Sequence, residues 1–282
     1  MESINPKSAR ALPLVKKYRS QGKKLTPAQK KMLLQYVIEA LLREGQHLVS
    51  RGGIITTRSE IVPYNPGKEW DLDSSLDLLI SNNALHLPNY NDLRSRDVIH
   101  AQRSFIILAD KSNSLGPVID YVALAVSVLA EAIKSENYSL IFFDSEPKVS
   151  KSIRGYADHA AILEEILDIE CRGATDLYAA FSEAKRQLDA APAGTEGICI
   201  MISDCIHTDG DDPLKGALLL PKVDILLVNN EASAIGNSCA DKLNRLSNVT
   251  LRKINELSDI VDAIQEIVSY GGLQSSEKLK IS

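Results

Sequence analysis

Five oxygen-bearing side chains stand in three short motifs, and each motif adjoins a segment with the pattern of regular secondary structure. Asp110, Ser112 and Ser114 alternate along DKSNS, directly after an apolar run. Thr175 lies in GATDL, just before a helical pattern, and Asp204 lies in ISDC at the end of a second apolar run. Two carboxylates and three hydroxyls are hard ligands, which suit Mg²⁺ and also Mn²⁺. The sequence therefore predicts a magnesium site formed by these five residues.

Two alternatives compete with this interpretation. A zinc site is disfavoured, because no Cys or His is among the five residues. Helix capping is the main alternative for Ser114 and Thr175, since hydroxyl side chains near a helix start commonly accept backbone hydrogen bonds. Each motif alone is a weak signal, and it is their conjunction, in order and at strand ends, that favours the metal site.

Apolar strand patterns alternate with helical patterns from residue 103 onward. The strand patterns lie at 104–109, 138–143, 197–203, 223–228 and 249–254. The helical patterns lie at about 117–134, 158–168, 175–190, 235–246 and 256–270. Strands that are apolar on both faces and separated by helices predict an α/β fold with a doubly wound, mostly parallel sheet. The polar segment KVSKSIR predicts one antiparallel edge strand. Ligands of such sheets bind at the carboxyl ends of the strands, where the three motifs would meet.

The first hundred residues are expected to be a basic, mainly helical N-terminal region. Thr26, Pro27 and Gln29 form a capping-box pattern, so a helix is expected from there to about residue 49. Its apolar face is too wide for a helix standing alone, and we expect it to pack on the domain at 103–272. Residues 273–282 are expected to form a flexible tail. The single tryptophan, Trp70, is expected to have a packing role.

Charge and cysteine content narrow the functional classes. Residues 1–58 hold twelve Lys and Arg against three Asp and Glu, whereas the whole chain has a net charge of −5. Without a recognition motif, such a basic segment favours a solvated or intramolecular docking surface over nucleic-acid binding. The four cysteines form no CxxC pair and are expected to be reduced.

The N-terminus lacks the apolar region of a signal peptide, and no apolar run approaches the ~18 residues that cross a bilayer. We therefore expect a cytoplasmic location.

The block from about 103 to 272 resembles the von Willebrand factor A domain. The motifs DKSNS, GATDL and ISDC match the three loops of its metal-ion-dependent adhesion site. The resemblance implies a doubly wound sheet whose bound Mg²⁺ is completed by an Asp or Glu of a partner protein. Two positions depart from the family pattern: Asn113 and Cys205 stand where glycine is frequent. Neither departure removes a ligand, but both bear on the loop geometry.

The front third, including EWDLDSSLDLL, more loosely resembles intracellular proteins of the CoxE-like type. That resemblance implies an adaptor that works with a MoxR-type AAA+ ATPase in the assembly or activation of other proteins. An RNA-associated von Willebrand A protein that uses the basic front, and a metal-dependent hydrolase, are the alternatives. We expect no enzymatic activity, because the chain has no GxSxG, P-loop, GxGxxG or HExxH motif. His207 is expected to face solvent, and HTDGDDP, with Asp209, Asp211 and Asp212, is expected to be a turn.

Overall fold

The computed structural model describes residues 11–52, 57–64, 69–81, 93–100, 103–228, 234–255 and 257–269. The chain divides into two compact units, which are described separately below. The first unit joins 1–54 with 103–271, and the second comprises 55–102 with 272–282. The main segment of the second unit ends at residue 102, and the N-terminal helices belong to the first unit.

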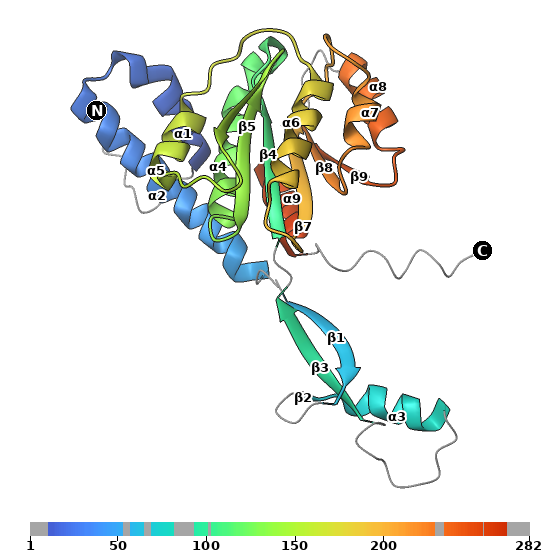
Figure 1. Ribbon diagram of the computed structural model, residues 1–282. Helices are drawn as coiled ribbons and strands as arrows, with labels where there is room; N and C mark the ends of the chain where they lie inside the picture. The colour runs from blue at the N-terminus through green and yellow to red at the C-terminus, as the bar shows by residue number, and fades with distance from the viewer. Residues whose placement is uncertain are drawn as a thin grey trace. The chain divides into compact units, whose positions relative to one another are not determined.

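The first unit is built on a six-stranded sheet in the order β6-β5-β4-β7-β8-β9 (Figure 1). Neighbouring strands are parallel except for β5 and β6, which are antiparallel. This confirms the predicted mostly parallel sheet with an antiparallel edge strand. The strands are β4 (Arg103–Asp110), β5 (Asn137–Phe143), β6 (Pro147–Lys151), β7 (Glu196–Ser203), β8 (Val223–Val228) and β9 (Val249–Ile254).

Helices cover both faces of this sheet. One face packs against α4 (Ile119–Ala132), α5 (His159–Leu167) and α9 (Leu257–Ser269). The other packs against α6 (Leu177–Asp189), α7 (Pro213–Ala217) and α8 (Ala234–Leu243). This two-sided cover is the doubly wound α/β arrangement that the alternating pattern predicted.

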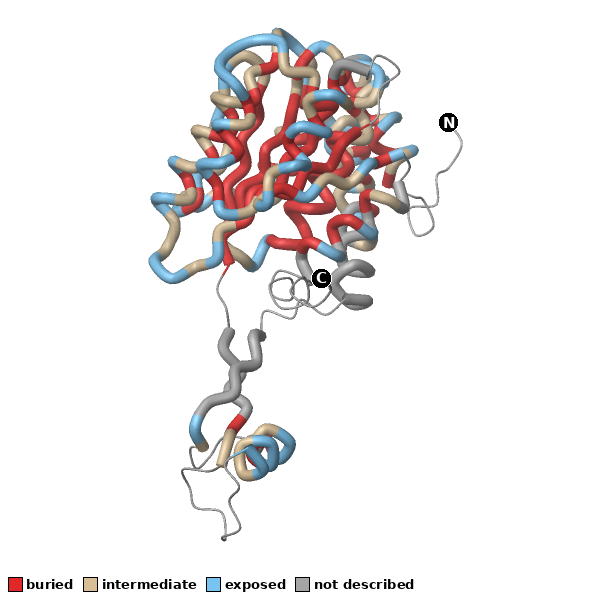
Figure 2. The backbone as a smooth tube through the Cα atoms, turned by 90° about the vertical axis from the view of Figure 1, so that its right-hand side faces the viewer, coloured by how far each residue is buried: buried red, intermediate tan, exposed pale blue. Residues whose placement is uncertain are grey.

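Strand β4 lies inside the sheet, and its burial explains why its sequence is a continuous apolar run. All eight residues of β4 are buried. Phe105 and Ile107 join the core cluster on one face, while Ile106 and Leu108 join the cluster on the other. Side chains alternate across a strand, so burial on both faces requires an unbroken apolar run. Figure 2 shows this buried interior running through the strands of the first unit.

Two N-terminal helices, α1 (Ala11–Gln21) and α2 (Pro27–Gly52), pack on α4. The predicted capping box is present at the start of α2: the Thr26 N–H donates to Gln29 Oε1 at 3.1 Å, and the Gln29 N–H donates to Thr26 Oγ1 at 3.4 Å. Leu33 and Val37 of α2 are buried in the same core cluster as α4. The prediction that this helix packs on the 103–272 domain is therefore confirmed.

Ion pairs and hydrogen bonds also join the same two helices to α4 and to the end of α5. Arg19 donates to the carbonyls of Leu167 and Ile169, each at 2.8 Å, and pairs with Asp120 at 2.8 Å. Lys30 pairs with Asp168 at 3.0 Å. Part of the basic character of the front segment is thus used in intramolecular docking.

The second unit contains β1 (Thr57–Pro63), β2 (Glu69–Trp70), β3 (Arg94–His100) and α3 (Leu72–Ser81). The three strands form an antiparallel sheet in the order β1-β3-β2. The Ser75 hydroxyl of α3 accepts a hydrogen bond from the Arg94 N–H at 2.8 Å, which ties the helix to β3. The side chain of Trp70 and the predicted tail at 273–282 lie outside the described residues.

One segment of the described chain, Asn113–Ala132, is long and apolar enough to cross a membrane, with a mean hydropathy of 1.6. The expectation that no apolar run approaches that length was therefore wrong. The segment includes α4, and 72% of the window is buried inside the fold. Its apolar character is explained by packing between the sheet and the N-terminal helices.

Candidate metal site at the carboxyl ends of the strands

The candidate site lies at the topological switch point of the sheet. From β4 the chain continues to β5 and β6 on one side, and later to β7, β8 and β9 on the other. Asp110 is the last residue of β4, and Ser203 is the last residue of its parallel neighbour β7. Loops leaving the two strands diverge here, which is where doubly wound folds bind ligands.

Asp110 is fully buried and held through both carboxylate oxygens. Its Oδ1 accepts the Ser112 N–H at 2.8 Å, and its Oδ2 accepts the Ser203 hydroxyl at 2.5 Å. The pKa of Asp110 is raised to about 7: burial and, to a smaller extent, the nearby Asp204 charge raise it, and the bonds from Ser203 and Ser112 lower it. The carboxylate is thus held in one orientation by two hydrogen bonds.

Asp204 supplies the second buried carboxylate, with an exposed fraction of 0%. Its Oδ1 accepts the Ile206 N–H at 3.1 Å. Its Oδ2 is buried and has no hydrogen-bond partner. A buried carboxylate oxygen without a partner is costly, so this atom marks a position where a cation would be stabilising.

Ser112 and Ser114 present their hydroxyls to each other, with 3.1 Å between the two Oγ atoms. Ser112 is buried and precedes the short 3₁₀ helix at Asn113–Val118, but its side chain makes no capping hydrogen bond there. Ser114 lies within that helix.

The cap of α6 is Asp176, whose Oδ1 accepts the Ala179 N–H at 2.9 Å. The N-cap of α6 is thus Asp176 and not Thr175.

Thr175 is fixed from its backbone by the loop after β7. Its N–H donates to Thr208 Oγ1 at 2.9 Å, and its carbonyl accepts the N–H groups of Thr208 and Asp209 at 3.0 and 3.2 Å. One residue beyond the cap, the Leu177 N–H donates to His207 Nδ1 at 3.4 Å. His207 is half-buried in this contact, so the expectation that it simply faces solvent was wrong.

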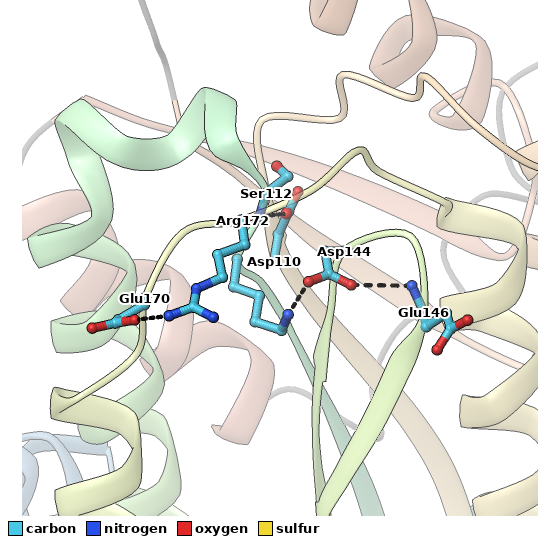
Figure 3. A network of polar contacts seen from close by, with 7 residues as sticks. Asp110, Ser112, Asp144, Glu146, Glu170 and Arg172 are labelled. Carbon is cyan, nitrogen blue, oxygen red and sulfur yellow. Dashed lines mark hydrogen bonds and ion pairs between the residues drawn. The ribbon is translucent and has the colours of Figure 1, made fainter.

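Hydrogen bonds also join the first motif to the loop that carries Thr175. The Arg172 N–H donates to the Lys111 carbonyl at 2.8 Å, and the Asn113 N–H donates to the Gly173 carbonyl at 3.3 Å. Close to these bonds, Asp144 pairs with Lys111. Asp144 also accepts the Glu146 N–H at 3.1 Å, as Figure 3 shows. Hydrogen bonds thus join all three motif loops to one another.

The two departures from the family pattern have different consequences. Asn113 is exposed, and its backbone keeps the bond to Gly173. Cys205 has φ 56°, a left-handed conformation that glycine adopts without strain. Its backbone N–H donates to Ser203 Oγ at 2.9 Å, which stabilises the conformation.

Sequence reasoning missed two residues that shape the site. Ser203 lies between Asp110 and the loop after β7, yet a serine at a strand end carries no signal of its own. Gly236 of α8 lies against the carbonyl of Asp204, where an added Cβ would come within 2.2 Å of that oxygen. By contrast, HTDGDDP contains a bend at 209–211 and ends at the start of α7, where Asp212 caps the helix by accepting the Leu214 N–H at 3.0 Å.

The donor set fits a hard divalent cation. The structure brings Asp110 and Asp204 together at one buried edge with the two serines, and Thr175 is tied to the same loop as Asp204. Within the described residues, no cluster of three or more His, Cys, Asp or Glu side chains occurs. Ligation here would rest on two carboxylates and hydroxyls, a set that suits Mg²⁺ better than zinc.

Comparison with known proteins supports the fold assignment. Residues 105–207 match the family model described as von Willebrand factor type A domain. Comparison with curated proteins gave no match.

Several solved structures are similar to the chain. The conserved hypothetical protein BatB from Bacteroides thetaiotaomicron is 14% identical with a TM-score of 0.50, over 60% of this chain and 98% of that one. A von Willebrand factor type A protein from Catenulispora acidiphila is 16% identical with a TM-score of 0.47, over 62% of this chain and 44% of that one. This chain therefore spans less than half of the Catenulispora protein.

The matched segment runs from β4 through the loop after β7 and so includes all three motifs, while the sheet continues through β8 and β9. The chain is therefore similar over residues 105–207 to the von Willebrand factor type A domain, and its doubly wound fold agrees with that similarity.

Proposed function

We propose that this chain is a Mg²⁺-dependent protein-binding module and not an enzyme. The observation that supports the proposal most directly is the buried Asp204 Oδ2, which lacks a hydrogen-bond partner and lies near the buried Asp110 carboxylate. Two buried acidic groups close to each other are unfavourable, and a bound divalent ion relieves both.

Five side chains would hold the ion, with Mn²⁺ as a substitute for Mg²⁺. They are Asp110, Ser112, Ser114, Thr175 and Asp204. When bound, the ion supplies a positive charge that attracts a further carboxylate. Five side-chain ligands leave at least one position of an octahedral shell open, and only two of the five are negatively charged. An Asp or Glu of a partner protein can take that position.

The candidate partner is a MoxR-type AAA+ ATPase, which makes the chain an adaptor in ATPase-driven assembly or activation of other proteins. This part of the proposal is supported by the resemblance of the front third to CoxE-like proteins. A cytoplasmic location belongs to the same proposal.

The partner interaction is tested by co-purification in Mg²⁺ and in EDTA. We expect the complex to need both the metal and one acidic residue of the partner, which single substitutions of the partner's exposed Asp and Glu would identify. Complex formation that persists in EDTA would show that the partner docks elsewhere.

Two variants separate metal binding from partner binding. Asp204→Ala removes a charged ligand and should weaken both. Thr175→Ala removes a neutral hydroxyl and should weaken the partner more than the metal. The opposite order, with Thr175→Ala abolishing metal binding and leaving the partner unaffected, would contradict the assigned roles.

A further inference from the structure

Ser203 is a buried hydroxyl that connects two of the three loops at the candidate site. Its Oγ donates to Asp110 Oδ2 at 2.5 Å and accepts the Cys205 N–H at 2.9 Å. The side chain is fully buried, so no solvent molecule competes for either bond from the outside. One hydroxyl thus joins the end of β4 to the backbone of the loop after β7.

We propose that Ser203 is a positioning residue that orients Asp110 for the cation and couples the bound cation to the conformation of Cys205. The proposal rests on the proposed function, since it assumes that the site binds Mg²⁺. It assigns to this residue a role that the ligand motifs do not contain.

Bond directionality supports the coupling. A serine hydroxyl has a single proton, and because Ser203 uses it toward Asp110, its oxygen is directed to accept from Cys205. Consecutive hydrogen bonds of this kind polarise and strengthen one another. A cation that holds Asp110 in place would therefore also hold the hydroxyl in the orientation that Cys205 needs.

The strained backbone of Cys205 depends on the bond to Ser203, so losing this bond should change the loop after β7. A non-glycine residue at φ 56° is strained and persists only where its surroundings fix it. The Ser203 bond is one such restraint, and the close approach of Gly236 to the Asp204 carbonyl is a second. The loop continues to Thr208, which binds the backbone of Thr175. A change at Ser203 would thus reach all three motifs.

The test compares Ser203→Ala with Ser203→Thr in the full chain. Loss of a residue that orients a metal ligand typically weakens the metal by about 10- to 100-fold, and we expect Ser203→Ala to raise the Mg²⁺ dissociation constant by that factor. Ser203→Thr keeps the hydroxyl and should bind Mg²⁺ with the affinity of the wild type. Ser104→Ala is the matched control, because Ser104 is an equally buried strand serine that bonds Thr195 Oγ1 at 2.9 Å, at the opposite end of β4.

Amide hydrogen exchange at Cys205 provides the second measurement. In the wild type, Mg²⁺ should slow the exchange of this amide, and in Ser203→Ala saturating Mg²⁺ should leave it unchanged. Equal Mg²⁺ affinity in Ser203→Ala and the wild type would overturn the proposal, and so would an equal loss in Ser104→Ala or a failure of folded Ser203→Thr to restore binding. A wild type that binds no Mg²⁺ would instead reject the proposed function, and this role with it.

Discussion

At the scale of single residues, the protonation of Asp110 connects the fold to metal binding. Burial raises the pKa of this carboxyl from 3.8 to about 7. Because the pKa in the folded state is raised, the stability that Asp110 contributes to the metal-free protein is fully present below about pH 3.8. It is lost as the pH rises through about 7. The cation requires the deprotonated form, so protons and Mg²⁺ compete for the same group.

The first prediction follows from this competition. Mg²⁺ affinity should be constant above about pH 7 and should fall by about tenfold for each unit of pH below it, since one proton is displaced. The thermal shift caused by Mg²⁺ should accordingly be larger at pH 8 than at pH 5.5. Calorimetric titrations across this range provide the measurement, and an affinity that does not change between pH 5.5 and 8 would contradict the prediction.

The candidate ligands could be predicted from the sequence, but the residues that orient them could not. Asp110, Ser112 and Ser114 stand close together in one motif, and their spacing is visible in the chain itself. The role of Ser203 depends on the pairing of β4 with β7, which aligns Ala109 with Ile202 and is fixed only by the folded sheet.

At the scale of elements, the closeness of α8 to the loop after β7 gives a second prediction. A Cβ at Gly236 would lie 2.2 Å from the Asp204 carbonyl oxygen, so Gly236→Ala must displace either the helix or the loop. We expect weaker Mg²⁺ binding in this variant. Gly116→Ala is the control, because an added Cβ there meets nothing within 4 Å. Equal Mg²⁺ affinities in the two variants, measured by calorimetry, would show that the contact does not position Asp204.

The packing of α2 gives a third prediction. Val37 is fully buried in the core of the first unit, so Val37→Asp places a charge there and should lower the free energy of unfolding by about 3 kcal/mol. Met32→Asp in the same helix is the control, because Met32 is 55% exposed. Urea unfolding measures both, and equal midpoints would mean that α2 contributes little to the core.

The sequence predicted the strands of the first unit closely because a strand buried on both faces needs an uninterrupted apolar run. It missed α1, β3 and α7. Helix α7 spans only Pro213–Ala217, too short for a helical period to be recognised. Strand β3, Arg94–His100, is mostly polar in sequence and lacks the apolar signal of the central strands. Helix α1 carries Pro13, which is tolerated only because it lies in the first turn.

At the scale of the whole molecule, the opposite charges of the front segment and the remainder meet in specific contacts. Arg19 and Lys30 pair with Asp120 and Asp168, and Arg19 also binds the carbonyls at the start of the segment that leads to Thr175. The N-terminal helices thus contact the rest of the first unit at the segment that precedes the Thr175 loop. This contact could not be predicted from charge counts, because charge alone does not identify the partner of each cation.

The most direct test of the account is calorimetric titration of the whole chain with Mg²⁺. We predict one bound ion per chain in the wild type and none in Asp110→Ala, because this variant loses one of the site's two buried carboxylates. Asp209→Ala, which removes an exposed carboxylate from the loop after β7, should bind as the wild type does. Undiminished binding in Asp110→Ala, or equal losses in both variants, would contradict the assignment of the metal to the carboxyl ends of β4 and β7.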